Sequence, residues 1–108
     1  MLFKRDLALK IIEGKKTQTI RKRSWYKVGK IYKVNIGPRP AIAEIMITEK
    51  REITLKELTD EDAIREGFEN LEELKKYWTK TLKQEWNENE KYYAYKFKVI
   101  KIMKNPKI

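Results

Sequence analysis

A long alternating segment near the C-terminus limits what this chain can fold into. Along residues 92–103, one set of alternate positions is aromatic or aliphatic: Tyr93, Tyr95, Phe97 and Val99. The positions between them include Lys96 and Lys98. Such alternation is typical of a β-strand with one buried face and does not fit the period of a helix. We therefore predict a long strand, Tyr92–Met103, that closes a sheet.

Three shorter strands are predicted before the closing strand, over residues 17–21, 31–36 and 41–48. Each alternates β-branched, aromatic or small apolar residues with polar ones. A loop at Gly37–Pro40 separates the second strand from the third, because its two prolines cannot join a ladder. Residues 54–58 have no decisive pattern.

Helices are predicted before the first strand and after the third. Asp6–Glu13 forms the first helix and stops at Gly14. A short helix begins after the capping residue Thr59 and ends at Gly67, and another follows Asn70. The last helix carries an apolar stripe that we expect to lie mainly in the core: Leu71, Leu74, Trp78 and Leu82.

This order of elements indicates an α+β fold. Strands of unequal length around a small core, with two helices adjacent in sequence, favour a partly closed barrel. The chain has 108 residues, which suits one modest core, and it contains no internal repeat or linker. We predict a single domain over residues 1–108.

Histidine and cysteine are both absent. Their absence excludes disulfides, thiolate nucleophiles, cysteine zinc clusters, histidine bases and Ser-His-Asp triads. An enzyme with this sequence must use lysine, aspartate, glutamate, tyrosine, serine or threonine. We predict no metal and no cofactor, since there is neither a glycine-rich phosphate loop nor a carboxylate cluster with metal-ligand spacing.

The overall composition indicates a soluble intracellular protein. Apolar residues make up 41% of the chain and charged residues 39%, and no apolar run is long enough to span a bilayer. The first residues are interrupted by charges and lack a signal-peptide core. We expect a cytoplasmic location and no membrane partner. High lysine and glutamate usage without cysteine is typical of a thermophilic source.

The positive charge is concentrated in the first half of the chain. The formal net charge is +10, and residues 1–53 hold 14 lysines and arginines against 5 acidic residues. This asymmetry indicates a partner that carries phosphates. The alternative is a soluble surface with surplus lysines.

The segment Gly14–Arg21, GKKTQTIR, is the strongest candidate for a site. On a strand, Thr19 and Arg21 lie on the same face. Lys16 belongs to the turn after Gly14, from which its long side chain can reach that face. A lysine, a hydroxyl and an arginine so close together can bind an anion or a planar polar base. An exposed basic edge strand is the alternative.

The same segment resembles the GxKxxTxR signature of ASCH domains, which belong to the PUA-like superfamily. The resemblance extends over roughly residues 3–104, with the helix before Gly14, the turn Tyr26–Lys30 and the aromatic closing strand in the expected order. It implies a small mixed β-barrel with flanking helices. It also implies a cleft, lined by the signature, that takes RNA or a nucleobase.

One branch of small bacterial ASCH proteins, to which the resemblance extends, removes the acetyl group from N4-acetylcytidine. The resemblance implies Lys16, Thr19 and Glu66 as the catalytic set. Lys16 would act as a base if nearby cations or desolvation lowered its pKa, whereas an ionised Glu66 would oppose that shift. The sequence differs from this branch at Lys22-Arg23, where an acidic residue is expected. It also has a longer helix after Glu66.

A basic, aromatic segment adds candidate residues for binding RNA or a modified nucleoside. They are Lys15, Arg21, Lys22 and Arg23, which suit phosphates, and Trp25 and Tyr26, which suit stacking on bases. Burial in the core is the alternative for the two aromatic residues. Three functions remain open: a nucleic-acid or nucleotide-binding module, an N4-acetylcytidine amidohydrolase, and a ribonuclease for which no particular residue argues.

Overall fold

The computed structural model describes residues 1–103, and residues 104–108 of the predicted domain lie outside this range. The elements follow one another as α1 (Arg5–Ile12), β1 (Gln18–Arg21), β2 (Ile31–Val34), β3 (Ala43–Thr54), η1 (Leu55–Glu57), α2 (Asp60–Glu66), α3 (Leu71–Lys76), η2 (Tyr77–Thr81) and β4 (Lys91–Ile102). The predicted order of helices and strands is confirmed.

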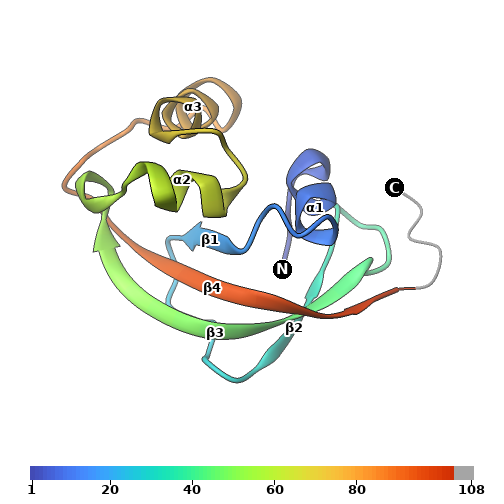
Figure 1. The fold of residues 1–108 in the computed structure, drawn as a ribbon. Helices are drawn as coiled ribbons and strands as arrows, with labels where there is room; N and C mark the ends of the chain where they lie inside the picture. The colour runs from blue at the N-terminus through green and yellow to red at the C-terminus, as the bar shows by residue number, and fades with distance from the viewer. Residues whose placement is uncertain (104–108) are drawn as a thin grey trace.

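The four strands form one antiparallel sheet in the order β1-β4-β3-β2. The sheet is strongly curved, with α2 and α3 over one end and α1 towards the other (Figure 1). The α+β prediction is therefore confirmed. The strand pairings within residues 1–103 do not close the sheet into a barrel, because β1 and β2 lie at its two edges.

β3 and β4 make the long ribbon that supports the rest of the fold (Figure 1). The predicted closing strand is present, but the prediction that the third strand ends at residue 48 is wrong, because β3 continues to Thr54. Its continuation is mostly charged and pairs with cations of β4. Glu49 lies 2.9 Å from Lys96, and Glu52 lies 3.7 Å from Lys91. Cross-strand ion pairs of this kind favour pairing that β-propensity alone does not predict.

Two apolar clusters pack against the ribbon of β3 and β4. One lies beneath α1 and includes Ile11, Ile45 and Phe97. The other lies beneath α2 and α3 and includes Ala63 and Trp78. β1 follows α1 and lies next to α2 (Figure 1). No helix in residues 1–103 is long and apolar enough to cross a membrane.

Candidate functional site

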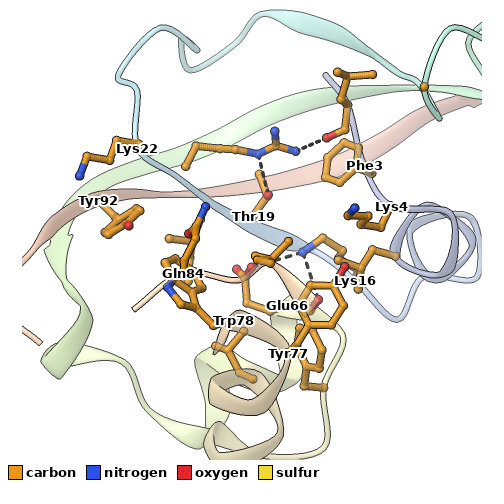
Figure 2. Close-up of a pocket in the computed structure, with 18 residues that line it drawn as sticks. Phe3, Lys4, Lys16, Thr19, Lys22, Glu66, Tyr77, Trp78, Gln84 and Tyr92 are labelled. Carbon is orange, nitrogen blue, oxygen red and sulfur yellow. Dashed lines mark hydrogen bonds and ion pairs between the residues drawn. The ribbon is translucent and has the colours of Figure 1, made fainter. Parts of the chain in front are cut away.

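A pocket of about 540 Å³ opens between the segment before α1, strand β1, the end of α2 and the α3–η2 helix. Figure 2 shows Lys16, Thr19 and Glu66 near its centre, Phe3 and Lys4 on one side, and Trp78, Gln84 and Tyr92 on the other. All three residues of the implied catalytic set therefore line one pocket. The apolar stripe of the last helix contributes to the same wall, because Leu74, Trp78 and Leu82 belong both to the core region and to the pocket lining.

Lys16 is buried, with 2% of its surface exposed, at the turn between α1 and β1. Gly14 ends α1 with a φ of 78°, a conformation that glycine adopts easily. The Lys16 ammonium then extends back beneath β1. Its Nζ donates to the carbonyl oxygen of Gln18 at 2.8 Å, to the carbonyl oxygen of Glu66 at 3.0 Å and to Oε1 of Glu66 at 3.3 Å. These acceptors can take all three ammonium protons.

Glu66 is the last residue of α2 and is 4% exposed. Gly67, with a φ of 102°, ends the helix directly beside the lysine. A Cβ at Gly67 would lie 3.6 Å from Cβ of Lys16 and 3.1 Å from Cδ of Lys10. A side chain there would be strained by the backbone and crowded by both lysines. Gly67 therefore permits the close approach of α2 to the signature segment.

Burial shifts the pKa values of this pair towards their neutral forms. Burial lowers the pKa of Lys16, Glu66 opposes the shift, and the charges of Arg21 and Lys10 reinforce it. Burial raises the pKa of Glu66, although Lys16 and Gln18 oppose that shift. Each direction reflects the cost of keeping a charge away from water. A lysine base and a carboxylic acid proton donor are the chemical roles that these shifts favour.

Thr19 and Arg21 lie on the same side of β1, as strand alternation predicts, and both line the pocket. Arg21 Nε donates to Oγ1 of Thr19 at 3.1 Å, and Nη2 donates to the carbonyl oxygen of Leu2 at 2.6 Å. The guanidinium also stacks 4.7 Å from the ring centre of Phe3. Arg21 is thereby fixed over the threonine, where its charge favours an ionised or partly ionised hydroxyl.

Among the other predicted binding residues, Lys22 alone belongs to the pocket lining. Lys22 lines the pocket, forms an ion pair with Glu90 and lies 5.2 Å from the ring centre of Tyr92. Lys15 and Arg23 are exposed and are not part of the lining. The Arg23 guanidinium stacks 5.3 Å from the ring centre of Trp25.

The two predicted stacking residues differ in their surroundings. Trp25 is 68% exposed, so its ring is accessible to a partner. Tyr26 packs edge-on against Tyr32 and Tyr95, with ring centres 5.0 and 5.3 Å away. The alternative of core packing applies to Tyr26 and not to Trp25. Neither residue lines the pocket.

The ASCH domain family matches residues 1–101 of the chain. The chain belongs to this family. The ASCH domain is a PUA-like fold associated with RNA binding. The signature resemblance that pointed to the family is thus supported by a match over nearly the whole described chain.

Solved structures resemble this ASCH domain in fold. The ASCH domain from Lactobacillus crispatus JV V101 has 20% identity and a TM-score of 0.71, covering 89% of this chain and 71% of that one. A protein from Enterococcus faecalis V583 has 16% identity and a TM-score of 0.68, with coverages of 90% and 68%. ASCH from Zymomonas mobilis has 19% identity and a TM-score of 0.64, with coverages of 94% and 70%. No curated protein matches the chain.

Many residues of the ASCH pocket region were not predicted as site residues from the sequence, among them Gln18, Phe3 and Tyr77. Gln18 is fully buried beside the pocket and donates to Asp62 at 3.4 Å. Phe3 and Tyr77 line the pocket from segments far apart in the sequence. The apolar period of the last helix places Tyr77 next to its buried stripe, but no motif marks it. Phe3 meets Arg21 only through the tertiary fold.

Several buried polar atoms of this ASCH domain have no hydrogen-bond partner among residues 1–103. Near the pocket they are Oε1 of Gln18, Oε2 of Glu66 and the Tyr77 hydroxyl. A buried polar atom without a partner is costly and is uncommon away from functional sites. Within the same residues, no group of three or more acidic side chains is arranged to hold a metal ion.

Proposed function

We propose that this ASCH domain binds RNA or a modified nucleoside and that its pocket takes one base. The observation that carries the proposal is the pocket itself, which joins an apolar and aromatic wall to Lys16, Arg21 and Lys22. Its volume of about 540 Å³ falls within the range of small-ligand sites, roughly 300–1,000 Å³.

The two sides of the pocket suit the two parts of a nucleotide. Trp78 and Tyr92 offer aromatic surface to a base, and stacking of this kind does not depend on base identity. Lys22, whose side chain is 58% exposed, lies where the pocket meets solvent. A cation at that position suits a phosphate, and the basic first half of the chain extends the same attraction to a longer strand.

Titration of the intrinsic tryptophan fluorescence with cytidine, cytidine monophosphate and a short single-stranded RNA tests this function. We expect binding that weakens steeply with salt for the RNA and only slightly for cytidine. Arg21→Ala should weaken binding of all three by about tenfold, because a charged donor at the pocket is lost. Lys101→Ala, which removes one exposed charge from the far end of β4, is the matched control. Absence of binding to all three ligands at low salt would contradict the proposal.

A second candidate function is hydrolysis of the amide of N4-acetylcytidine. The observation that favours it is the convergence of Lys16, Thr19 and Glu66 on one pocket, with Nζ 3.3 Å from Oε1. The set has the same residue types, in the same chain order, that the resemblance implies. It also supplies the base, the hydroxyl and the proton donor that amide hydrolysis needs in a chain without histidine or cysteine.

The proposed reaction uses these residues as follows. Neutral Lys16 takes a proton from the Thr19 hydroxyl or from water, and the resulting oxygen nucleophile attacks the acyl carbon. The C–N bond breaks while the leaving N4 nitrogen takes up the proton that Lys16 has removed, which Glu66 relays from the Lys16 ammonium to N4. With Thr19 as nucleophile, water then hydrolyses the acyl-threonine ester, so that the products are cytidine and acetate. Arg21, which donates to Oγ1 of Thr19, eases loss of the hydroxyl proton.

The assay is release of cytidine from N4-acetylcytidine, followed by chromatography at neutral pH, at ambient and at elevated temperature. Lys16→Ala should abolish turnover, and Lys16→Arg should be nearly as damaging because a guanidinium stays protonated. Glu66→Gln should reduce the rate by about a hundredfold or more through loss of the proton donor. Lys15→Ala is the matched control, since Lys15 is the exposed neighbour of Lys16. No product from folded wild-type protein would leave the binding function alone, and product from Lys16→Ala would refute the assigned residues.

A further inference from the structure

The Tyr77 hydroxyl is a polar group of the pocket that the proposed reaction does not use. Tyr77 lines the pocket, and Figure 2 shows its side chain rising from the helical wall into the same space as Lys16 and Glu66. Its hydroxyl oxygen is buried and has no partner among residues 1–103. An unpaired buried hydroxyl destabilises the protein, and a bound ligand that accepts its proton would offset that cost.

The backbone around Tyr77 holds the ring in place. Tyr77 is the first residue of η2, a π-helical turn that continues α3. Isolated π-helical turns are rare and occur frequently at functional sites. The ring packs against Phe68, with centres 5.1 Å apart and planes at 51°. The hydroxyl is therefore presented to the pocket by a fixed ring.

The protonation state of Tyr77 makes it a donor. Burial, with a smaller contribution from the charge of Asp6, raises the pKa of Tyr77 to about 12. The phenol stays neutral at any ordinary pH and keeps its proton. By contrast, Nζ of Lys16 already donates to Gln18 and Glu66.

An unpaired acceptor lies in the same pocket. Oε1 of Glu66 accepts from Lys16, but Oε2 is buried without a partner among residues 1–103. A ligand that satisfies both Tyr77 and Glu66 must carry an acceptor and a donor. A secondary amide carries both, as its carbonyl oxygen and its N–H.

We propose that Tyr77 determines the specificity of the pocket for an amide-bearing ligand. Its hydroxyl donates a hydrogen bond to the carbonyl oxygen of the amide, while Oε2 of Glu66 accepts from the amide N–H. This inference rests on the proposed nucleoside site and adds to it the group that the site recognises. During hydrolysis the same hydroxyl would stabilise the negative charge that develops on the carbonyl oxygen.

The test compares N4-acetylcytidine with N4-ethylcytidine, which has a similar shape but lacks the acyl oxygen. Stopped-flow tryptophan fluorescence gives both affinities before hydrolysis accumulates, because Trp78 lines the pocket. We expect the wild type to prefer the acetyl compound by about tenfold. Tyr77→Phe should abolish this preference and leave binding of the ethyl compound unchanged. Tyr93→Phe, outside the pocket, should keep the preference.

Stability separates ligand recognition from a structural role. Tyr77→Phe removes an unpaired buried hydroxyl, so its thermal midpoint should equal or exceed that of the wild type. Retention of the acetyl preference in Tyr77→Phe would overturn the inference while leaving the nucleoside site intact. Equal loss of both affinities together with loss of stability would also overturn it, by showing a structural residue. If the wild type bound neither compound, the proposed nucleoside site itself would fail.

Discussion

Helix α2 carries two buried carboxyl groups, one turn apart, that differ in almost every other respect. Asp62 is 3% exposed and Glu66 is 4% exposed. Asp62 lies in the first turn of the helix and Glu66 at its end. Both carboxyl groups are shielded from solvent, but their hydrogen-bond partners differ.

Asp62 is fully satisfied. Its Oδ2 accepts from the backbone N–H and the hydroxyl of Thr59 at 3.1 and 3.2 Å, which completes the cap of α2. Its Oδ1 accepts from Arg51, Arg65 and Gln18. Burial raises the pKa of Asp62, but the Thr59 hydrogen bonds and the charge of Arg51 outweigh it, so the net shift is downward. This aspartate is charged and holds the fold.

Glu66 is only partly satisfied. Its side chain pairs with one cation, Lys16, and lies near the Gln18 side chain and the backbone N–H of Ile20, but no donor among residues 1–103 is within hydrogen-bond distance of Oε2. Burial raises the pKa of Glu66 above its usual range. The difference teaches that burial of an acid in this protein does not identify its role. The unsatisfied group, not the satisfied one, is available to a ligand.

The largest effect on stability is expected when Lys16, the cation beside Glu66, is removed. Lys16→Met should reduce the free energy of unfolding by about 3–5 kcal/mol at neutral pH, because Glu66 loses the cation beside it and must either keep a buried charge unpaired or take up a proton. The double variant Lys16→Met, Glu66→Met should recover most of that loss, since it removes both charges. Urea denaturation of the wild type and the two variants measures this. A double variant no more stable than the single one would show that Lys16 stabilises the fold by packing alone.

A smaller loss of stability is expected when Asp62, the fully hydrogen-bonded carboxylate, is replaced. Asp62→Asn should reduce the free energy of unfolding by about 2–3 kcal/mol. The amide is a weaker acceptor than the carboxylate, and its NH₂ group would face the N–H and O–H groups that now donate to Asp62. Nucleoside affinity should not change, since Asp62 does not line the pocket. Denaturation and fluorescence titration of the same sample measure both quantities. Weaker binding with unchanged stability would reverse the roles assigned to the two acids.

The parts of the fold that sequence predicts are those set by local chemistry. Alternation predicted β4, and the pair Thr59 and Gly67 predicted both ends of α2. The continuation of β3 through Glu49 and Glu52 was not predicted, because charged residues have weak strand preference. Its pairing depends on the register with β4, which is a tertiary property.

The candidate site was predictable only through its signature. The signature identified Lys16, Thr19 and Arg21, and the order of elements indicated Glu66. Strand alternation does not predict the burial of Lys16, because Lys16 precedes β1 and lies in the turn, where alternation does not apply. Tyr77 carries no sequence signal at all, since its role depends on a hydroxyl left unpaired by packing.

Glu66→Gln should change stability less than either preceding variant. The amide keeps an oxygen for Lys16, which also retains two backbone carbonyl acceptors, so we expect a change of about 1 kcal/mol or less in the free energy of unfolding. Urea denaturation of Glu66→Gln beside Asp62→Asn gives the comparison directly. A loss larger than that of Asp62→Asn would place Glu66 among the residues that hold the fold.

The pH dependence of stability should have opposite signs for the two acids, and this is the smallest effect. The native pKa of Asp62 lies below its ordinary value of 3.8, so its contribution is present above that pH and is lost as the pH falls through the native value. The native pKa of Glu66 lies above its ordinary value of 4.5, so its contribution is present below that pH and is lost as the pH rises through the native value.

The measurement is urea denaturation between about pH 3 and pH 8 for the wild type, Asp62→Asn and Glu66→Gln. The stability advantage of the wild type over Asp62→Asn should shrink towards acid. Its advantage over Glu66→Gln should instead shrink as the pH rises above 4.5. Each variant cancels the titrating groups that do not interact with the substituted acid, and Lys16, whose pKa Glu66 raises, is the group that Glu66→Gln changes as well. Two difference curves that slope the same way would mean that Lys16 outweighs burial at Glu66, and that both acids of α2 are ionised, structural groups.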